Sequence, residues 1–238
     1  MEPLLAGRRS KCQALLNDAV GGSKATGEIY HEVVWPAMEC VDQLYRDDRI
    51  NVATEHMATR INRCLADQLQ AHLDRRASNG KKIMITCADD EPEELGAQIL
   101  ADLFEADGWE AFFLGGGVPN DEILSFVGQV RPDILLVYGS QPRGIPGVRQ
   151  LIDLIRDVGV HPTLNIMVSG GVFNRADALW EEIQADLFAR TAGEAVDIAR
   201  DAKPRPPENR VPGAPKKRRR RRHPPLLAQA ELAAQPPA

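Results

Sequence analysis

The 238-residue sequence lacks paired cysteines, long apolar runs and an apolar leader, and each absence excludes a class of protein. Its cysteines are not spaced as C-x-x-C, which argues against a zinc site and favours buried, reduced thiols. The longest apolar runs are strand-sized, far shorter than a membrane span. No basic segment followed by an apolar one opens the chain, so we expect no secretory leader and a cytoplasmic location. The four cysteines are Cys12, Cys40, Cys64 and Cys87.

Charge is divided unevenly along the chain, whose formal net charge is −5. Residues 203–238 contain ten Lys or Arg and two Glu, which gives this segment a net charge of +8. Residues 1–202 contain the remaining 19 basic and 32 acidic residues, a net charge of −13. Pro, Lys and Arg dominate 203–238 without an apolar period, which predicts a disordered Pro/Arg-rich tail. Its basic run, Lys216–Arg222, contains no aromatic residue for stacking on single strands. Three interpretations of the run remain open: a solubilising segment, non-specific contact with nucleic acid, or docking on an acidic partner.

Apolar periodicity before Gly80 predicts a helical cap over residues 24–80, preceded by an N-terminal segment, 1–23, with one weak helical pattern. The first long pattern covers residues 26–45 and contains Pro36, where the helix should kink or begin again. The second covers residues 52–73, with Asn51 and Thr54 as the candidate N-caps.

After Gly80 the pattern changes to strands that alternate with helices. Apolar runs predict strands at residues 82–87, 110–114, 134–138, 163–168 and 187–188. The predicted helices are 91–107, 120–130, 145–158, 176–183 and 193–202. This alternation is typical of an α/β domain with a doubly wound parallel sheet, here over residues 81–202. Ligands of such sheets bind beyond the carboxyl ends of the strands, which makes candidates of the loops 87–96, 115–119, 138–144 and 169–173.

The candidate motifs in these loops and in the cap also have ordinary structural explanations. The acids Glu91, Glu93 and Glu94 stand at a predicted helix N-terminus, where the helix dipole favours negative charge. Residues 115–117 are three glycines, but they follow the second strand and are not a dinucleotide fingerprint. In the cap, Tyr45 is followed after nine residues by Glu55-His56. A lone His on a helix is usually structural, whereas a Tyr, Glu and His on one surface favour a ligand contact.

Taken together, these residues resemble the cobalamin-binding module shared by corrinoid methyltransferases and bacterial light-responsive repressors. That module joins a small helical cap to a flavodoxin-like α/β domain, and cobalamin lies between them. The resemblance covers about residues 25–202 and depends on four stretches. The family's loop Asp/Glu-x-His-x-x-Gly is matched here by Glu91 and Gly96, and its Ser-x-Leu/Thr motif lies at residues 138–140. The Gly-Gly that stands beside the nucleotide tail in the family is matched by residues 170–171. The cap motif of the family is matched by Tyr45 and by residues 55–56.

The resemblance implies cobalamin as the cofactor, with haem or a bilin as alternatives. In the family, the loop His displaces the base of cobalamin and coordinates cobalt, whereas Glu93 here is a hard oxygen ligand and a poor substitute. Tyr138 replaces a small Ser and should narrow the channel that takes the displaced base. We therefore expect bound cobalamin to keep its own base on the metal, or to have water or His56 there, with Glu55 orienting His56. The expected cofactor-binding residues are Tyr45, Glu55, His56, Glu93, Gly96, Tyr138, Ser140, Gly170 and Gly171.

A lone cap and α/β module, with no helix-turn-helix pattern before it, is most similar to the PpaA/AerR-type antirepressors of purple-bacterial photosynthesis genes. This likeness implies a photoreceptor-like tetrapyrrole sensor, not an enzyme, that regulates transcription through a transcriptional repressor or another regulatory protein. Non-specific DNA contact through Lys216–Arg222 would assist it, and no membrane association is expected. Two alternatives remain open: a corrinoid methyl-carrier subunit of a methyltransferase system, and a scaffold without cofactor. A homo-oligomeric state is also left open.

Overall fold

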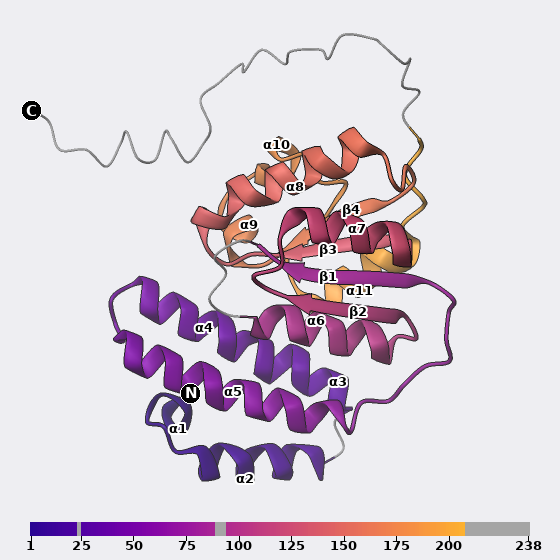
Figure 1. Ribbon diagram of the computed structural model, residues 1–238. Coiled ribbons are helices and arrows are strands. Elements are labelled where there is room, and N and C mark those ends of the chain that lie inside the picture. The colour runs from indigo at the N-terminus through magenta and orange to yellow at the C-terminus, as the bar shows by residue number, and fades with distance from the viewer. Residues whose placement is uncertain (23–24, 89–93, 208–238) are drawn as a thin grey trace, which may run out of the picture.

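The computed structural model describes residues 1–22, 25–88 and 94–207, which form a helical cap packed beside an α/β domain (Figure 1). The cap comprises α1 (Glu2–Leu5), α2 (Arg9–Val20), α3 (Thr26–Ile29), the π-helix η1 (Tyr30–Val34), α4 (Trp35–Arg46) and α5 (Val52–Gln70). Asn51 caps α5, because its side-chain oxygen accepts a hydrogen bond of 2.9 Å from the backbone N–H of Thr54.

The helix predicted over residues 26–45 is interrupted, as Pro36 led us to expect. Proline has no N–H to donate to the preceding helical turn, and its ring crowds the carbonyl four residues earlier. The chain widens into the π-helical turn Tyr30–Val34 immediately before α4, so the break lies just N-terminal to the proline.

The α/β domain contains one parallel sheet in the order β2-β1-β3-β4-β5. Its strands are β1 (Lys82–Cys87), β2 (Glu110–Gly115), β3 (Ile134–Tyr138), β4 (Asn165–Ser169) and β5 (Leu187–Ala189). Its helices are α6 (Leu95–Ala106), α7 (Asn120–Val130), η2 (Pro142–Gly144), α8 (Ile145–Val158), α9 (Gly171–Arg175), α10 (Leu179–Glu182) and α11 (Ala192–Asp201). This is the flavodoxin-like order, so the predicted fold is confirmed, and its switch point lies between β1 and β3.

One predicted helix differs from the structure. Residues 176–183 form no continuous helix, because Ala178 adopts a left-handed φ of 58° and α10 begins only after it. The preceding helical turn, α9, starts directly at Gly171. For the helix predicted over 91–107, the described part begins at Leu95, and residues 91–93 lie outside the described residues.

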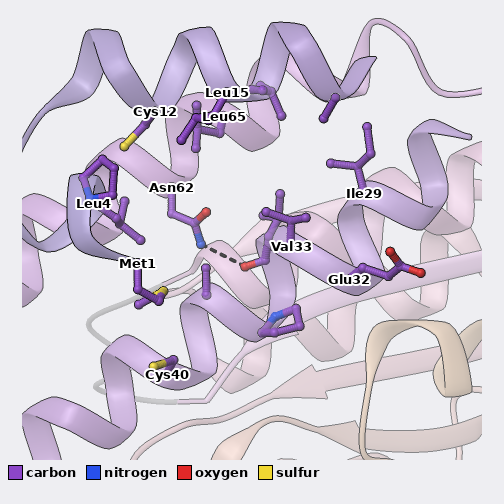
Figure 2. A pocket seen from close by; sticks show the side chains of 16 residues that line it. Met1, Leu4, Cys12, Leu15, Ile29, Glu32, Val33, Cys40, Asn62 and Leu65 are labelled. Carbon is purple, nitrogen blue, oxygen red and sulfur yellow. Dashed lines mark hydrogen bonds between the residues drawn. The ribbon is translucent and has the colours of Figure 1, made fainter. Parts of the chain in front are cut away.

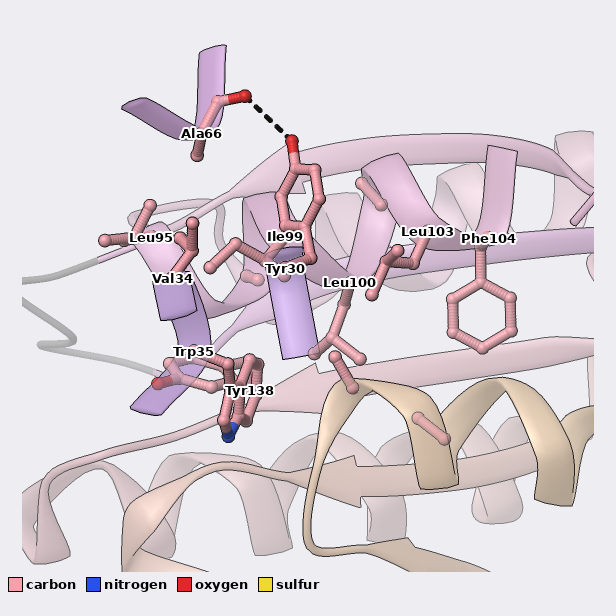
Figure 3. Close-up of a cluster of buried hydrophobic side chains, with 14 of the residues drawn as sticks. Tyr30, Val34, Trp35, Ala66, Leu95, Ile99, Leu100, Leu103, Phe104 and Tyr138 are labelled. Atoms are coloured by element: carbon pink, nitrogen blue, oxygen red, sulfur yellow. Dashed lines mark hydrogen bonds between the residues drawn. The ribbon is translucent and has the colours of Figure 1, made fainter. Parts of the chain in front are cut away.

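Alternate side chains of the strands build a core on each side of the sheet. On β1, Ile83 and Ile85 face α6, α11 and the cap, whereas Met84 faces α7 and α8. The cap packs on the outer side of α6, and Tyr30 is fully buried in that contact (Figure 3). The strand arrows of Figure 1 point toward the end of the cap at which α4 turns into α5. The cap therefore lies beside the carboxyl ends of the strands, where ligands of this fold bind.

The segment that follows α11 is attached at the opposite end of the sheet. The backbone N–H of Arg205 donates to the carbonyl of Thr163 at 3.0 Å, and its guanidinium lies 3.0 Å from a carboxylate oxygen of Asp186. The basic run 216–222 lies outside the described residues. Within the ranges that the structure describes, no helix combines the length and the apolar character needed to cross a membrane.

Candidate functional site

A cavity of about 320 Å³ lies between the cap and the carboxyl ends of β3 and β4. Helix α4 contributes one continuous face to it, since the lining positions 35, 38, 39, 42 and 45 recur at helical spacing. Helix α5 contributes positions 52, 55, 56 and 59, and the α/β domain contributes residues after β3 and β4. The lining residues are Trp35, Met38, Glu39, Asp42, Tyr45, Val52, Glu55, His56, Thr59, Tyr138, Ser140, Gln141, Arg143 and Gly171.

Six of the nine residues expected from the sequence line this one cavity: Tyr45, Glu55, His56, Tyr138, Ser140 and Gly171. Gly96 and Gly170 lie behind it and pack against residues of the 138–140 segment. Glu93 lies outside the described residues. The structure thus brings together the cap motif and the strand-end motifs, which are about 80 residues or more apart in the sequence.

Tyr138, the last residue of β3, fills the space above Gly96. The ring rests so closely on Gly96 that a Cβ atom at that position would overlap it. The hydroxyl points toward the cap and lies 3.9 Å from the sulfur of Met38, and only 5% of the residue is exposed. We expected Tyr138 to narrow the channel that takes a displaced base, and in the structure its aromatic ring packs against the first turn of α6.

Arg175 joins the cap to the α/β domain at the edge of the cavity. Its guanidinium donates a 2.6 Å hydrogen bond to the carbonyl of Ser140 and lies 3.4 Å from a carboxylate oxygen of Asp42 on α4. The same carboxylate oxygen accepts a 3.0 Å hydrogen bond from Arg46. Because a Cβ atom at Gly171 would stand 2.6 Å from Arg175, glycine at 171 allows this side chain to lie over the backbone.

Trp35 places a buried donor at the cavity. Only 3% of the residue is exposed, and its indole nitrogen has no hydrogen-bond partner among the residues that the structure describes. Glu39, one turn further along α4, lines the same cavity; burial raises the pKa of its carboxyl group more than the neighbouring indole lowers it. Trp35 and Glu39 are therefore interacting neighbours on the α4 wall of the cavity.

His56 lies at the rim of the cavity and is the candidate metal ligand from the sequence. Its Nε2 is 3.5 Å from a carboxylate oxygen of Glu55, and 62% of its side chain is exposed. Among the described residues, no three His, Cys, Asp or Glu side chains come together as a metal site. His56 therefore remains a candidate contact to a bound ligand, with Glu55 beside its imidazole.

Glu94, which we treated as a helix-dipole residue, has a specific partner in the structure. Its carboxylate accepts a 2.6 Å hydrogen bond from the backbone N–H of Gly116, in the loop after β2. This bond ties the start of α6 to the loop 115–117 and so fixes two of the loops at the switch point. Gly115 at the start of that loop has a φ of 72°, which suits glycine.

A second, larger cavity of about 570 Å³ lies within the cap itself (Figure 2). It is lined mostly by apolar residues of α1, α2, η1, α4 and α5, and Asn62 donates a 3.0 Å hydrogen bond to the carbonyl of Val34 at its wall. The cavity lies away from the strand ends and contains none of the nine expected residues. We therefore place the candidate site at the smaller cavity.

The residues at the smaller cavity fit the ring of a corrinoid but not a nucleotide tail inserted into the domain. Trp35, Met38 and Tyr45 give the α4 wall an apolar surface on which a corrin ring would pack. The cavity is smaller than a complete cobalamin, so part of the ligand must lie outside it or the cap must shift. The space above Gly96 is occupied by Tyr138.

Comparisons with known proteins identify a family for the chain. The family model described as B12 binding domain matches residues 81–200, and a second model with the same description matches residues 2–69. Dimethylamine corrinoid protein 3 of Methanosarcina mazei is 26% identical over 108 residues, which are 45% of this chain and 64% of that protein. A corrinoid protein of Desulfitobacterium hafniense is 24% identical over 118 residues, 50% of this chain and 54% of that protein.

A solved structure shows the same fold. The monomethylamine corrinoid protein of Methanosarcina barkeri superposes with a TM-score of 0.75 at 17% identity, covering 83% of this chain and 93% of that one. This chain spans between half and two thirds of the length of the curated relatives named above. The expected cofactor, cobalamin, is confirmed by the match to the family.

The interpretation as a photoreceptor-like transcription sensor that acts on a repressor protein was wrong. The curated relatives named above are corrinoid proteins, one of them named for dimethylamine, and the narrower likeness to antirepressors is not shown. The reason is physical: the motifs that carried the resemblance lie at one cavity, and they concern ligand binding. Residues that bind a ligand do not report what the bound ligand is used for, so they could not distinguish a carrier from a sensor.

Proposed function

The chain belongs to the B12 binding domain family, and we propose that it is a corrinoid protein that presents its bound cofactor to a partner methyltransferase. The observation that supports this most is the cavity between the cap and the strand ends, with a matched family segment on each side of it. In this proposal the chain supplies the binding site, the partner supplies the substrate pocket, and the chain has no catalytic activity of its own.

When bound, a corrinoid supplies a metal centre that accepts a methyl group and gives it up to an acceptor. The residues of this chain bind and orient the ring. The face of α4 would cover it, with Trp35, Met38 and Tyr45 packed on the ring. His56 is exposed at the rim of the cavity, where it would contact the bound corrinoid, and Glu55 would orient its imidazole.

Binding is tested with the full chain and methylcobalamin, by gel filtration and by tryptophan fluorescence. A corrinoid in the cavity should co-elute in equimolar amount and quench Trp35, which lines the site, more than Trp109 or Trp180, which do not. Trp35→Phe should therefore lose most of the quenching, whereas Trp180→Phe should keep it. Failure of methylcobalamin to co-elute would refute the proposal.

The carrier role is tested separately with methyl-labelled methylcobalamin bound to the chain. On addition of a purified corrinoid-dependent methyltransferase and a thiol acceptor, label should pass to the thiol faster than from the same concentration of free methylcobalamin. Tight binding without any such transfer would leave a corrinoid-binding protein and exclude the carrier role with that enzyme.

A further inference from the structure

The position of Tyr138 has a consequence for the choice of ligand that goes beyond the proposed function and rests on it. Tyr138 ends β3 at the switch point, where β3 lies directly beside β1 in the sheet. One route from the cavity into the domain, called the passage below, lies between the end of β3 and the start of α6. That passage is the space between Tyr138 and Gly96.

This passage is filled by the aromatic ring. The ring lies against Gly96 without room for even one additional carbon atom, and 5% of the residue remains exposed. Its surroundings are themselves buried: Leu95 is 0% exposed and Trp35 is 3% exposed, and all three residues belong to the core shared by cap and α/β domain. Figure 3 shows these side chains in the cluster.

The adjacent strand end is closed as well. Gly170 follows β4 with a φ of 110°, and a Cβ atom there would overlap the carbonyl oxygen of Gly139. The backbones of the two strand ends therefore touch directly. Ser169, whose hydroxyl has no partner among the described residues, is 0% exposed behind them. Among the described residues, the ring of Tyr138 and the contact of Gly170 with Gly139 fill the space at the ends of β3 and β4 that a displaced nucleotide base would need.

We propose that Tyr138 makes the chain select corrinoids whose lower nucleotide stays outside the protein. These are cobalamin with its own base still on the metal, and corrinoids that carry no nucleotide at all. The ring of the ligand then lies over the strand ends under the cap, and its lower substituent points to solvent or stays folded beneath the ring. Tyr138 thereby determines which form of the ligand binds, by exclusion rather than by contact with the metal.

The experiment uses the full chain, its Tyr138→Phe variant and its Tyr138→Ser variant. Phe keeps the ring that fills the passage, whereas Ser removes it. The probes are methylcobalamin, which is red with its base on the metal and yellow with the base displaced, and cobinamide, the same ring without the nucleotide. The affinity for each probe is measured by titration, and the colour of the bound methylcobalamin by absorbance.

We expect bound methylcobalamin to stay red on the wild type and on Tyr138→Phe, and cobinamide to bind both with nearly the affinity of cobalamin. Tyr138→Ser should come to prefer cobalamin over cobinamide by about tenfold, as the nucleotide gains contacts in the opened passage. The wild-type measurements test the proposal even where the Ser variant folds poorly.

Two results overturn the proposal in distinguishable ways. If methylcobalamin turns yellow on the wild type, the ring of Tyr138 does not exclude the base, and the proposal fails while corrinoid binding stands. If the wild type binds neither probe, the proposed function is wrong, and the inference about Tyr138, which depends on it, is wrong as well.

Discussion

A buried hydrogen bond between the cap and α6 should make the stability of the protein depend on pH, and Asp102→Asn should remove that dependence. The hydroxyl of Tyr30 lies 2.8 Å from the carbonyl oxygen of Ala66 on α5 and 3.0 Å from a carboxylate oxygen of Asp102 on α6. A phenol has one proton, and both neighbours are acceptors while Asp102 is ionised. The network is complete only with Asp102 protonated, when the acid donates to Tyr30 and Tyr30 donates to Ala66.

The magnitude follows from the pKa of Asp102, which rises from 3.8 to about 6. Burial is the main cause; the charges of Glu105 and Asp67 raise the pKa further, and hydrogen bonds from Tyr30 and Gln70 lower it. Because the pKa is higher in the folded state, the contribution to stability is complete below pH 3.8 and is lost as the pH rises through 6. The total loss is about 3 kcal/mol, and about half of it falls between pH 5 and pH 8.

The assay is guanidinium unfolding of the wild type and Asp102→Asn at pH 5 and pH 8. The Asn amide donates to Tyr30 at every pH, so the variant should be the more stable protein at pH 8, by about 1–3 kcal/mol. This advantage should be smaller at pH 5, by about half of the total loss expected for the wild type. Tyr30→Phe is the matched control, since it deletes the hydroxyl but leaves the carboxyl to titrate. An equal pH dependence in wild type and Asp102→Asn would refute the reasoning.

Three further predictions concern the site and the tail. His56→Ala should weaken methylcobalamin binding or shift its absorbance without lowering the unfolding midpoint, because the imidazole is 62% exposed; unchanged binding and spectrum would contradict a ligand contact. Arg175→Ala should speed the uptake of methylcobalamin in stopped-flow measurements, because it removes the bond between cap and α/β domain at the cavity edge; an unaltered rate would count against that bond as a barrier. Ending the chain after Pro207 should leave the free energy of unfolding within about 0.5 kcal/mol of the full chain. Ending it after Ala202 should lower the free energy of unfolding by about 1–3 kcal/mol, because this shorter chain loses the contacts of Arg205. Equal stability of the two truncated chains would show that these contacts contribute nothing.

The fold was predictable because its signals are local. Strands such as β1 and β3 are short apolar runs bounded by polar residues, and the period of the pattern changes at Gly80. The error at residues 176–183 has a local cause too, the left-handed Ala178, but an alanine gives no sequence signal for that conformation.

The site was predictable only in part, because five of its fourteen lining residues lie on a face of α4 that the apolar pattern does not report. The stripe that predicted the helix is Ile29, Val33, Val34, Ala37, Val41 and Leu44. The cavity uses the neighbouring stripe at 35, 38, 39, 42 and 45, where an aromatic residue, a methionine and two acids follow one another at helical spacing. Such a mixed stripe beside an apolar one is a usable signal, and it would have added Trp35 and Glu39 to the candidates.

The two features with the sharpest consequences could not be found from spacing at all. Tyr30 and Asp102 are 72 residues apart, and each is unremarkable in its own helical pattern. Because the two side chains are buried against one another, the contact between an ordinary acid and an ordinary phenol depends on pH. Tyr138 is a milder case: the substitution of a small residue was visible, but whether a larger ring blocks a channel or turns away depends on its neighbour. The absence of a side chain at Gly96 decides this, because it leaves the ring a flat surface on which to pack. Gly96 thus matches the family's loop while an aromatic ring of the protein itself fills the space above it, so a matched glycine alone does not show which ligand a site admits.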